Sequence, residues 1–152
     1  FIARRIMICA SEDVGNADPR ALTVAVSAAQ AVERIGMPEA QIILSQAATY
    51  VACAPKSNSA CNAIFAANEE VRRSGNLPIP SHLQDAHYKG AAKLGHGTGY
   101  KYAHDYPNHY VEQQYLPYEL TGKKYYEPSW NGYEAKIREH MKKIKEEARE
   151  KE

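Results

Sequence analysis

Residues 18–36 read DPRALTVAVSAAQAVERIG, and they predict one long helix with a defined start and end. Asp18 suits the capping position, and Pro19 suits the first helical position, where its missing N–H costs nothing. Gly36 is typical of the residue that follows a helix. Apolar side chains cover most of the circumference in between, which predicts a helix buried on all sides. This stretch therefore favours an all-α fold.

The flanking sequence repeats this pattern, so residues 1–75 are expected to form an Ala-rich helical bundle. They contain 17 Ala and a single Tyr, and small side chains let helices pack closely in an antiparallel arrangement. The first helix is expected to end near Ala10, with a break over residues 11–16. Another helix should begin at Pro38 and end before Pro55.

A fourth helix is expected between the candidate N-cap Ser57 and Gly75. Apolar residues at spacings of four, three and four give it a packing face, which comprises Ala60, Ile64, Ala67 and Val71. The cysteines of the chain lie in such apolar stretches without metal-ligand spacing, and we expect buried, reduced thiols in an intracellular protein. They are Cys9, Cys53 and Cys61.

The rest of the chain differs in composition. Residues 76–132 are expected to form a short helix over 81–94 and then an irregular, Tyr-rich strap. Ten of the 11 Tyr lie in residues 88–133. Disordered segments are poor in aromatic residues, so we expect Tyr rings packed on the bundle and a very short strand pair near Tyr125. Residues 133–152 should form a long charged helix with a narrow apolar stripe. The stripe comprises Tyr133, Ile137, Met141, Ile144 and Ala148.

Composition excludes several classes of protein. The formal net charge is +1, from 19 basic and 18 acidic residues, which gives no global reason to bind a polyanion. No run of 18 apolar residues exists, so no membrane span is expected. The first residue is Phe1, in a segment that reads as a helix already under way. We therefore expect one domain of a larger protein.

Histidines gather in the strap, which raises the question of a metal site. No pair has the helical spacing of metal ligands, so we favour imidazoles hydrogen-bonded to Tyr hydroxyls and to the backbone, and we expect no metal. A small metal-dependent or hydrolytic enzyme remains the least favoured hypothesis. The residues concerned are His82, His87, His96, His104 and His109.

The other candidate catalytic motifs are weak. Residues 95–99 read GHGTG between Lys93 and Lys101, but no strand precedes them as in a nucleotide-binding loop, so a tight structural turn is expected. No Ser has the setting of a nucleophile elbow. The pair Glu69 and Glu70 is interpreted as charge on a solvated helix face. No catalytic or cofactor-binding residue is predicted.

Basic and aromatic residues alternate in the strap, a pattern that can bind single-stranded nucleic acid by charge and stacking. The alternative is packed Tyr with solvated Lys. The pattern comprises Lys89, Lys93, Lys101, Lys123 and Lys124 with Tyr88, Tyr100, Tyr102, Tyr125 and Tyr126.

Many ordered motifs resemble one known family. They are ICASEDVGNADP (8–19), APKSN (54–58), DAHYKG (85–90), LGHG (94–97), GYKY (99–102), HDYP (104–107), QQYLP (113–117) and YYEP (125–128). Nearly the whole chain is similar to the C-terminal region of the RarA/MgsA replication-associated recombination proteins, which are relatives of the Werner-helicase-interacting ATPase.

The resemblance implies a helical collar, similar to that of clamp-loader subunits, in an AAA+ DNA-dependent ATPase of replication forks, DNA repair and recombination. ATP and Mg would bind upstream, outside this chain, which would be non-catalytic. The implied partners are further copies in a homotetramer, DNA and single-stranded-DNA-binding protein, in the cytoplasm at the nucleoid. A DNA- or protein-contacting role is the alternative. Candidate structural or interaction residues within the motifs are Asp85, His87, Tyr88, Lys89, Gly95, His96, Gly97, Tyr100, Tyr102, His104, Asp105, Gln114 and Tyr115.

Overall fold

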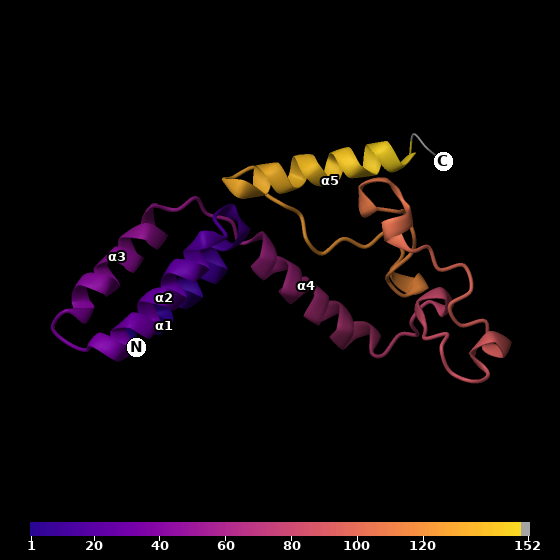
Figure 1. Ribbon diagram of the computed structural model, residues 1–152, viewed down its shortest axis with the longest axis horizontal. Helices are drawn as coiled ribbons and strands as arrows, with labels where there is room; N and C mark the ends of the chain where they lie inside the picture. The colour runs from indigo at the N-terminus through magenta and orange to yellow at the C-terminus, as the bar shows by residue number, and fades with distance from the viewer. Residues whose placement is uncertain (150–152) are drawn as a thin grey trace. The chain divides into compact units, whose positions relative to one another are not determined.

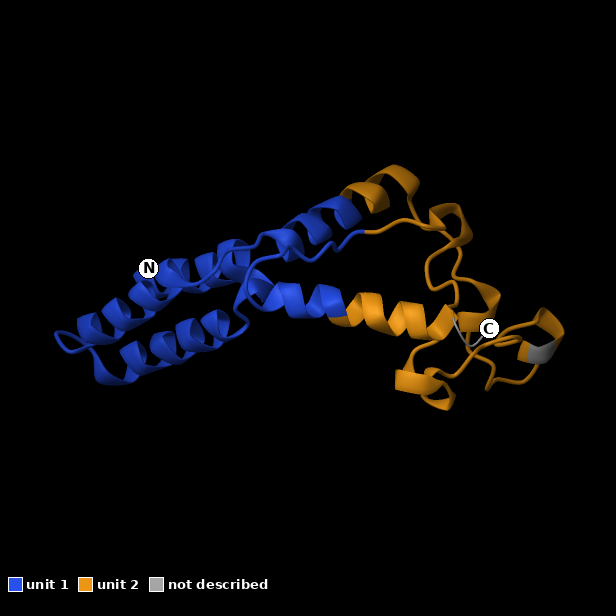
Figure 2. Cartoon of the chain, turned by 90° about the horizontal axis from the view of Figure 1, so that it is seen from above, with its two compact units in different colours: residues 1–68, 125–139 blue, residues 69–124, 140–152 orange. Residues whose placement is uncertain are grey.

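The computed structural model describes residues 1–149, apart from the side chain of Ala92. The chain forms two compact units (Figure 2): unit 1 comprises residues 1–68 and 125–139, and unit 2 comprises residues 69–124 and the chain from residue 140 onward. The described residues contain five α-helices and no strand, which confirms the all-α class. No helix in this part of the chain is long and apolar enough to cross a membrane.

Three helices pack together in unit 1 (Figure 1): α1 (Ile2–Cys9), α2 (Arg20–Ile35) and α3 (Ala40–Cys53). The first α-helix ends at Cys9, close to the predicted Ala10, but the predicted break over residues 11–16 is itself helical, because a π-helical turn covers Ala10–Val14. The polar residues of this turn face solvent.

The turn ends at Gly15, whose φ is 51°. A Cβ atom there would lie 2.8 Å from the carbonyl oxygen of Ser57. Only glycine therefore combines this backbone conformation with so close an approach of the two segments. A short 3-10 turn over Gly15–Ala17 then leads into α2.

The core of unit 1 is built from small side chains. Asp18 caps α2 as predicted, since its Oδ1 accepts a hydrogen bond from the backbone N–H of Arg20 at 3.1 Å. The prediction that α2 is buried on all sides is wrong, because Leu22 is 43% exposed and Val26 is 37% exposed. Ala residues at the contacts bring the helices close together, which leaves the larger side chains outside. The buried apolar residues here are Ala10, Val14, Ala17, Ala21, Ala25, Ala28, Ala40, Ala47 and Val51.

The helix α4 (Ser59–Ser74) begins where predicted, with Ser57 Oγ accepting a hydrogen bond from the Ser59 N–H at 3.2 Å. The expectation that this helix packs within the bundle of residues 1–75 is wrong, however, because α4 does not pack along α1, α2 or α3. In its predicted packing face, Ile64 is 55% exposed and Val71 is 62% exposed. Periodicity shows that a helix has an apolar side, but it does not show which partner covers that side.

Unit 2 is mostly turns, which confirms the irregular strap. The helix predicted over 81–94 is wrong: two short 3-10 turns, Ser81–Leu83 and Ala91–Leu94, lie at its ends. Gly90, with φ of 102°, interrupts any helix between them. The strand pair expected near Tyr125 is also absent from the described residues. Further 3-10 turns cover Ala103–Asp105, Pro107–His109 and Tyr118–Leu120.

The Tyr side chains do not form the packed layer that the sequence predicted. Six in the strap remain more than a third exposed, because the short turns offer few apolar surfaces to cover them. They are Tyr88, Tyr100, Tyr102, Tyr106, Tyr115 and Tyr118. The buried-thiol prediction is wrong too: Cys9 and Cys61 are half-buried and Cys53 is exposed.

The long terminal helix is confirmed as α5 (Tyr133–Arg149). Most of its apolar stripe is half-buried, including Ile137, Met141 and Ile144. Tyr133, at its start, is 50% exposed. The first turns of α5 belong to unit 1 and its later turns to unit 2.

Candidate interaction surface and its buried carboxylates

The residues predicted from the sequence all lie in unit 2, where they make separate local contacts. Asp85 Oδ1 accepts a hydrogen bond from the backbone N–H of His87 at 2.9 Å and lies 2.8 Å from His87 Nδ1. The backbone N–H and the ring together hold the pKa of Asp85 below its ordinary value. Tyr88 Oη lies 2.7 Å from Nδ1 of His96. These contacts order the turn around them.

The glycine-rich segment is the tight turn that the sequence predicted. Gly95, Gly97 and Gly99 have φ values of 72°, 73° and 81°. The N–H of Gly97 donates to the carbonyl oxygen of Ser81 at 2.9 Å, and a Cβ there would lie 2.7 Å from Ala86 Cβ. No strand leads into this turn and no helix follows it directly, so its residues do not fit a phosphate-binding loop.

The histidines make the contacts that the structural interpretation favours. His82 Nε2 lies 2.8 Å from the carbonyl oxygen of Gln114. The rings of His104 and His109 are 4.9 Å apart between centroids, and that of Tyr102 is 5.1 Å from His104. Among the residues described, no group of three or more His, Cys, Asp and Glu side chains is arranged to hold a metal ion.

The other predicted residues are spread over the surface of unit 2. Lys89, Tyr100 and Asp105 are exposed. Tyr115 is 54% exposed, and its Oη accepts a hydrogen bond from Gln113 Nε2 at 2.9 Å. Unit 2 therefore does not gather the predicted residues into one site, and their roles in binding stay predictions.

A buried carboxylate in unit 1 was missed from the sequence. Glu134, in the first turn of α5, is 0% exposed. Its oxygens accept hydrogen bonds from Ser57 Oγ at 2.5 Å, from the Ser129 N–H at 2.8 Å and from Tyr126 Oη at 2.9 Å. Burial alone would raise the pKa of Glu134, but these donors outweigh it and lower the pKa below its ordinary value. The carboxylate joins the starts of α4 and α5 to the segment between them.

A second carboxylate, that of Asp18, does more than cap α2. Its Oδ2 accepts a hydrogen bond from Tyr50 Oη of α3 at 2.8 Å, and its Oδ1 lies 3.1 Å from Arg20 Nε. Burial alone would raise the pKa of Asp18. The hydrogen bonds from Tyr50 and Arg20 outweigh this effect, so the pKa lies below its ordinary value. The same hydrogen bond raises the pKa of Tyr50. Sequence spacing could not reveal this contact, since the partners are 32 residues apart.

The third buried carboxylate is Glu70 in unit 2, which is 8% exposed. The interpretation of this residue as part of a solvated face is wrong. Its oxygens lie 2.6 Å from Arg73 and 3.1 Å from Lys123 Nζ. Arg73 and then Lys123 lower the pKa of Glu70. The two cations cover a carboxylate that would otherwise face solvent.

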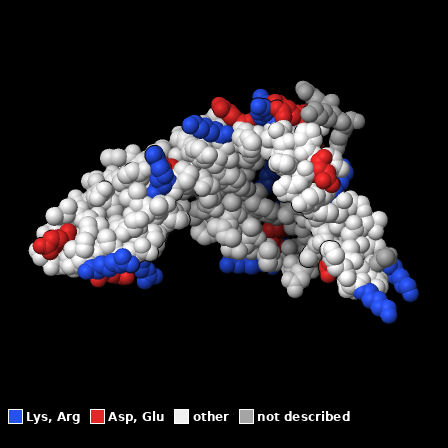
Figure 3. Space-filling model, in the orientation of Figure 1, with Lys and Arg blue, Asp and Glu red and all other residues white. Residues whose placement is uncertain are grey.

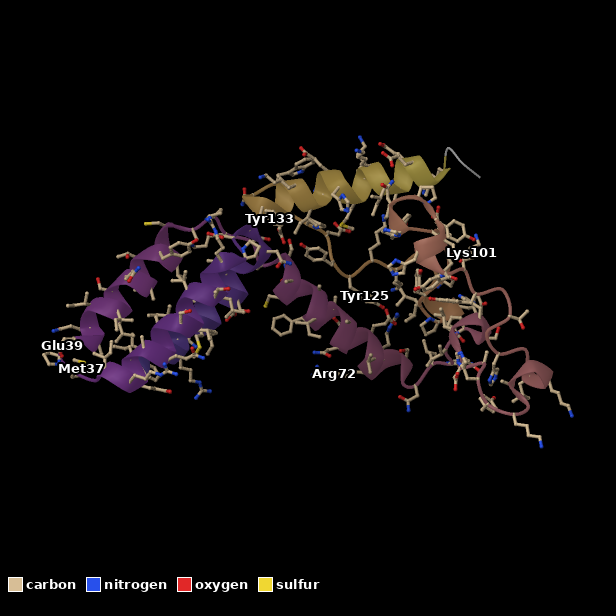
Figure 4. All side chains as sticks on the ribbon, viewed as in Figure 1. Met37, Glu39, Arg72, Lys101, Tyr125 and Tyr133 are labelled. Atoms are coloured by element: carbon tan, nitrogen blue, oxygen red, sulfur yellow. The ribbon has the colours of Figure 1, made fainter. Side chains whose placement is uncertain are left out.

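Several large apolar side chains on the outside of unit 1 are exposed, and we call this set its apolar face. Met37 lies in the turn between α2 and α3 (Figure 4) and is 72% exposed. Figure 3 shows few charged side chains over much of the same helices on the side in view. The apolar face comprises Phe1, Ile2, Leu22, Val26, Ile35, Met37, Ile42, Ile64 and Phe65.

The apolar side chains that unit 1 exposes are larger than those that it buries. Burial of apolar area stabilises by about 25 cal/mol per Å², and Ala offers little of it. Unit 1 buries Ala and Val while exposing Leu, Ile, Met and Phe. Interaction sites on proteins expose large apolar side chains of this kind. The apolar face is therefore the candidate functional surface of unit 1.

Comparison with known proteins decides the family. The family described as MgsA AAA+ ATPase C terminal matches residues 1–145. The chain belongs to this family. Its membership confirms the resemblance seen in the sequence motifs.

Named relatives of this MgsA C-terminal domain span bacteria and a eukaryote. The chain is 46% identical over 144 residues to replication-associated recombination protein A of Bacillus subtilis, covering 94% of this chain and 34% of the relative. It is 42% identical over 142 residues to the protein of that name from Escherichia coli K12, covering 93% of this chain and 32% of the relative. It is 38% identical over 128 residues to ATPase WRNIP1 of Dictyostelium discoideum, covering 84% of this chain and 15% of the relative. The chain thus spans about a third of the bacterial relatives.

Proposed function

We propose that this MgsA C-terminal domain is the non-catalytic self-association domain, or collar, of an AAA+ ATPase that acts in replication-associated recombination. Four copies are the expected number. The ATP and Mg site then belongs to the rest of the protein, and the whole ATPase contacts DNA and single-stranded-DNA-binding protein. The names of the relatives support the setting, and the apolar face of unit 1 supports the role.

The single observation that carries this proposal is the inverted distribution of side-chain size in unit 1. Phe65 is 63% exposed and Ile42 is 69% exposed, while the helix contacts are made by Ala. A second copy that covers these side chains adds the apolar burial that one copy lacks. Obligate interfaces of this kind bury about 2,000 Å² or more. The self-association interface is therefore proposed to lie on the apolar face.

Light scattering of the chain at several protein concentrations tests the proposal. We expect a multimer for the unchanged protein and dissociation for Leu22→Glu/Val26→Glu, which places two charges on the exposed side of α2. Helical circular dichroism should be unchanged, because both side chains already contact solvent. A clean monomer of the unchanged chain at high micromolar concentration would exclude a collar function.

A matched control separates the interface from general repulsion. Gln41→Glu/Ser45→Glu adds the same charge at the same spacing on α3, at two exposed polar positions. It should leave the multimer intact. Equal dissociation of both variants would show that added charge alone breaks the assembly, and the apolar face would lose its role.

A further inference from the structure

A groove in unit 2 brings together basic residues from two parts of the chain. Its volume is about 620 Å³, and five of its lining residues are basic whereas two are acidic. We call it the basic groove. It is lined by Tyr110, Val111, Glu112, Gln113, Tyr115, Gly122, Lys123, Lys124, Lys142, Lys145, Glu146 and Arg149.

The later turns of α5 supply one wall of the basic groove. Lys142, Lys145 and Arg149 follow one another at spacings of three and four residues, which places them on one side of the helix. Lys123 and Lys124 come from the segment that follows the 3-10 turn Tyr118–Leu120. The charge is therefore assembled from two parts of the chain that sequence alone would not bring together.

The ion pairs in the basic groove leave its cations accessible. Arg149 Nε lies 3.6 Å from Glu112, and Lys142 Nζ lies 3.7 Å from Glu146. The basic side chains of these pairs remain 69% and 76% exposed. Such exposed pairs are weak and are screened by salt, so phosphates can replace their acidic partners. Lys124 and Lys145 have no ion-pair partner within the described part of the chain.

Two aromatic rings accompany the cations. Tyr115 is 54% exposed, and the hydrogen bond from Gln113 Nε2 to its Oη, at 2.9 Å, restrains the side chain. Tyr110 lies half-buried in the same lining. Cations that track a backbone, together with a ring on which bases stack, are the pattern of single-strand binding without sequence preference.

We infer that the basic groove binds single-stranded nucleic acid, with phosphates on the cations of α5 and a base stacked on Tyr115. This inference goes beyond the proposed self-association, because it concerns unit 2 and a different kind of partner. The groove shares Lys123 and Lys124 with the sequence-based pattern, but that pattern also included Lys89 and Lys93. Neither of them lines the groove, and they serve as controls.

The test is fluorescence anisotropy of a labelled oligothymidine of about 20 nucleotides, titrated with the chain at low and moderate salt. The logarithm of the binding constant should fall with the logarithm of salt concentration with a slope of roughly −2 to −3, as expected for three or four phosphates on a single strand. Lys142→Ala/Lys145→Ala should weaken binding about tenfold at low salt. Lys89→Ala/Lys93→Ala removes equal charge from the same unit and should leave binding within about twofold.

Stacking is tested at constant charge. Tyr115→Ala should weaken binding about fivefold or more, whereas Tyr115→Phe keeps the ring and should bind as the unchanged protein does. Circular dichroism verifies that each variant keeps its helices, and light scattering verifies that the assembly is unchanged. If the unchanged chain is a monomer but still binds the oligothymidine, the proposed collar is contradicted and the inference about the basic groove stands.

Three outcomes overturn the inference. The first is no binding at low salt, where charge-driven binding must be strongest. The second is an equal loss of affinity in both double Lys variants, which would mean that the nucleic acid is attracted by the overall charge of unit 2 and not by the basic groove. The third is that polyglutamate of equal charge fully displaces the oligothymidine and that Tyr115→Ala does not weaken binding. Together these two results would assign the groove to an acidic protein segment.

Discussion

Unit 1 and unit 2 are stabilised by different means. Unit 1 has regular helices whose contacts are made by Ala, and its large apolar side chains face outward. Unit 2 has short 3-10 turns, exposed Tyr and a groove lined by charged residues. The helical unit therefore leaves its largest apolar side chains uncovered within one copy of the chain, whereas the irregular unit is held by local hydrogen bonds and ion pairs.

The two units also differ in the partners of their buried carboxylates. In unit 1, the partners of Glu134 are two hydroxyls and one backbone N–H, all uncharged. In unit 2, the partners of Glu70 are Arg73 and Lys123. Salt weakens attraction between exposed charges and hardly affects hydrogen bonds between buried groups. Stability that comes from unit 2 should therefore depend more on salt than stability that comes from unit 1.

The largest effect is expected at Gly132, which precedes α5 in unit 1. Its φ is 54°, and a Cβ there would overlap the carbonyl oxygen of Ala17 and lie 2.7 Å from Pro55 Cγ. The left-handed conformation and the overlap with backbone together should cost Gly132→Ala about 4 kcal/mol in the free energy of unfolding. For a chain of this size, Tm should fall by roughly 8 to 16 °C in a thermal melt at fixed protein concentration.

A glycine with the same sign of φ but open space is the control. Gly75 has φ of 66°, and nothing lies within 4 Å of a Cβ built on it. Gly75→Ala should therefore cost only the conformational term, about 1 kcal/mol. Equal losses in the two variants would show that the close approach of Gly132 to Ala17 contributes nothing.

The next largest effect is expected for Glu134→Gln. The amide keeps one oxygen acceptor in place of two, so buried donors on Ser57, Tyr126 and Ser129 compete for it. Leaving such donors unsatisfied should cost about 2 to 3 kcal/mol, or roughly 4 to 12 °C in Tm. Glu139→Gln, at an exposed position of the same helix, should change Tm by less than about 1 °C.

The pH dependence of stability gives this prediction a second readout. The folded pKa of Glu134 lies below its ordinary value of 4.5. Its contribution is therefore complete above pH 4.5 and is lost as pH falls through the lower, folded pKa. The difference in Tm between the unchanged chain and Glu134→Gln should shrink over that range. A difference that stays constant with pH would mean that the carboxylate is not the group that stabilises unit 1.

The sequence revealed the regular part of this fold better than the contacts that complete it. The start of α2 followed from Asp18 and Pro19, and the extent of α5 from its stripe, because capping and periodicity are local. The partner of α4 and the burial of Glu70 and Glu134 were not predicted. Each depends on segments far apart in the chain, and an acidic residue on a helix has the same local pattern whether solvent or a donor faces it.

The smallest effect, and the one that separates the two units most sharply, is expected for Glu70→Gln. The variant removes the attraction of Arg73 and Lys123 without changing the shape of the side chain, so it should lower Tm at low salt. Because both cations are partly exposed, with side chains 69% and 47% accessible, salt should screen that attraction over a Debye length of about 3 Å at 1 M. The loss of Tm should therefore shrink at 1 M salt, whereas the loss for Glu134→Gln should persist.

Glu69→Gln, at the exposed neighbouring position, is the control. If salt reduced the two losses equally, the contrast between neutral donors in unit 1 and cations in unit 2 would not hold.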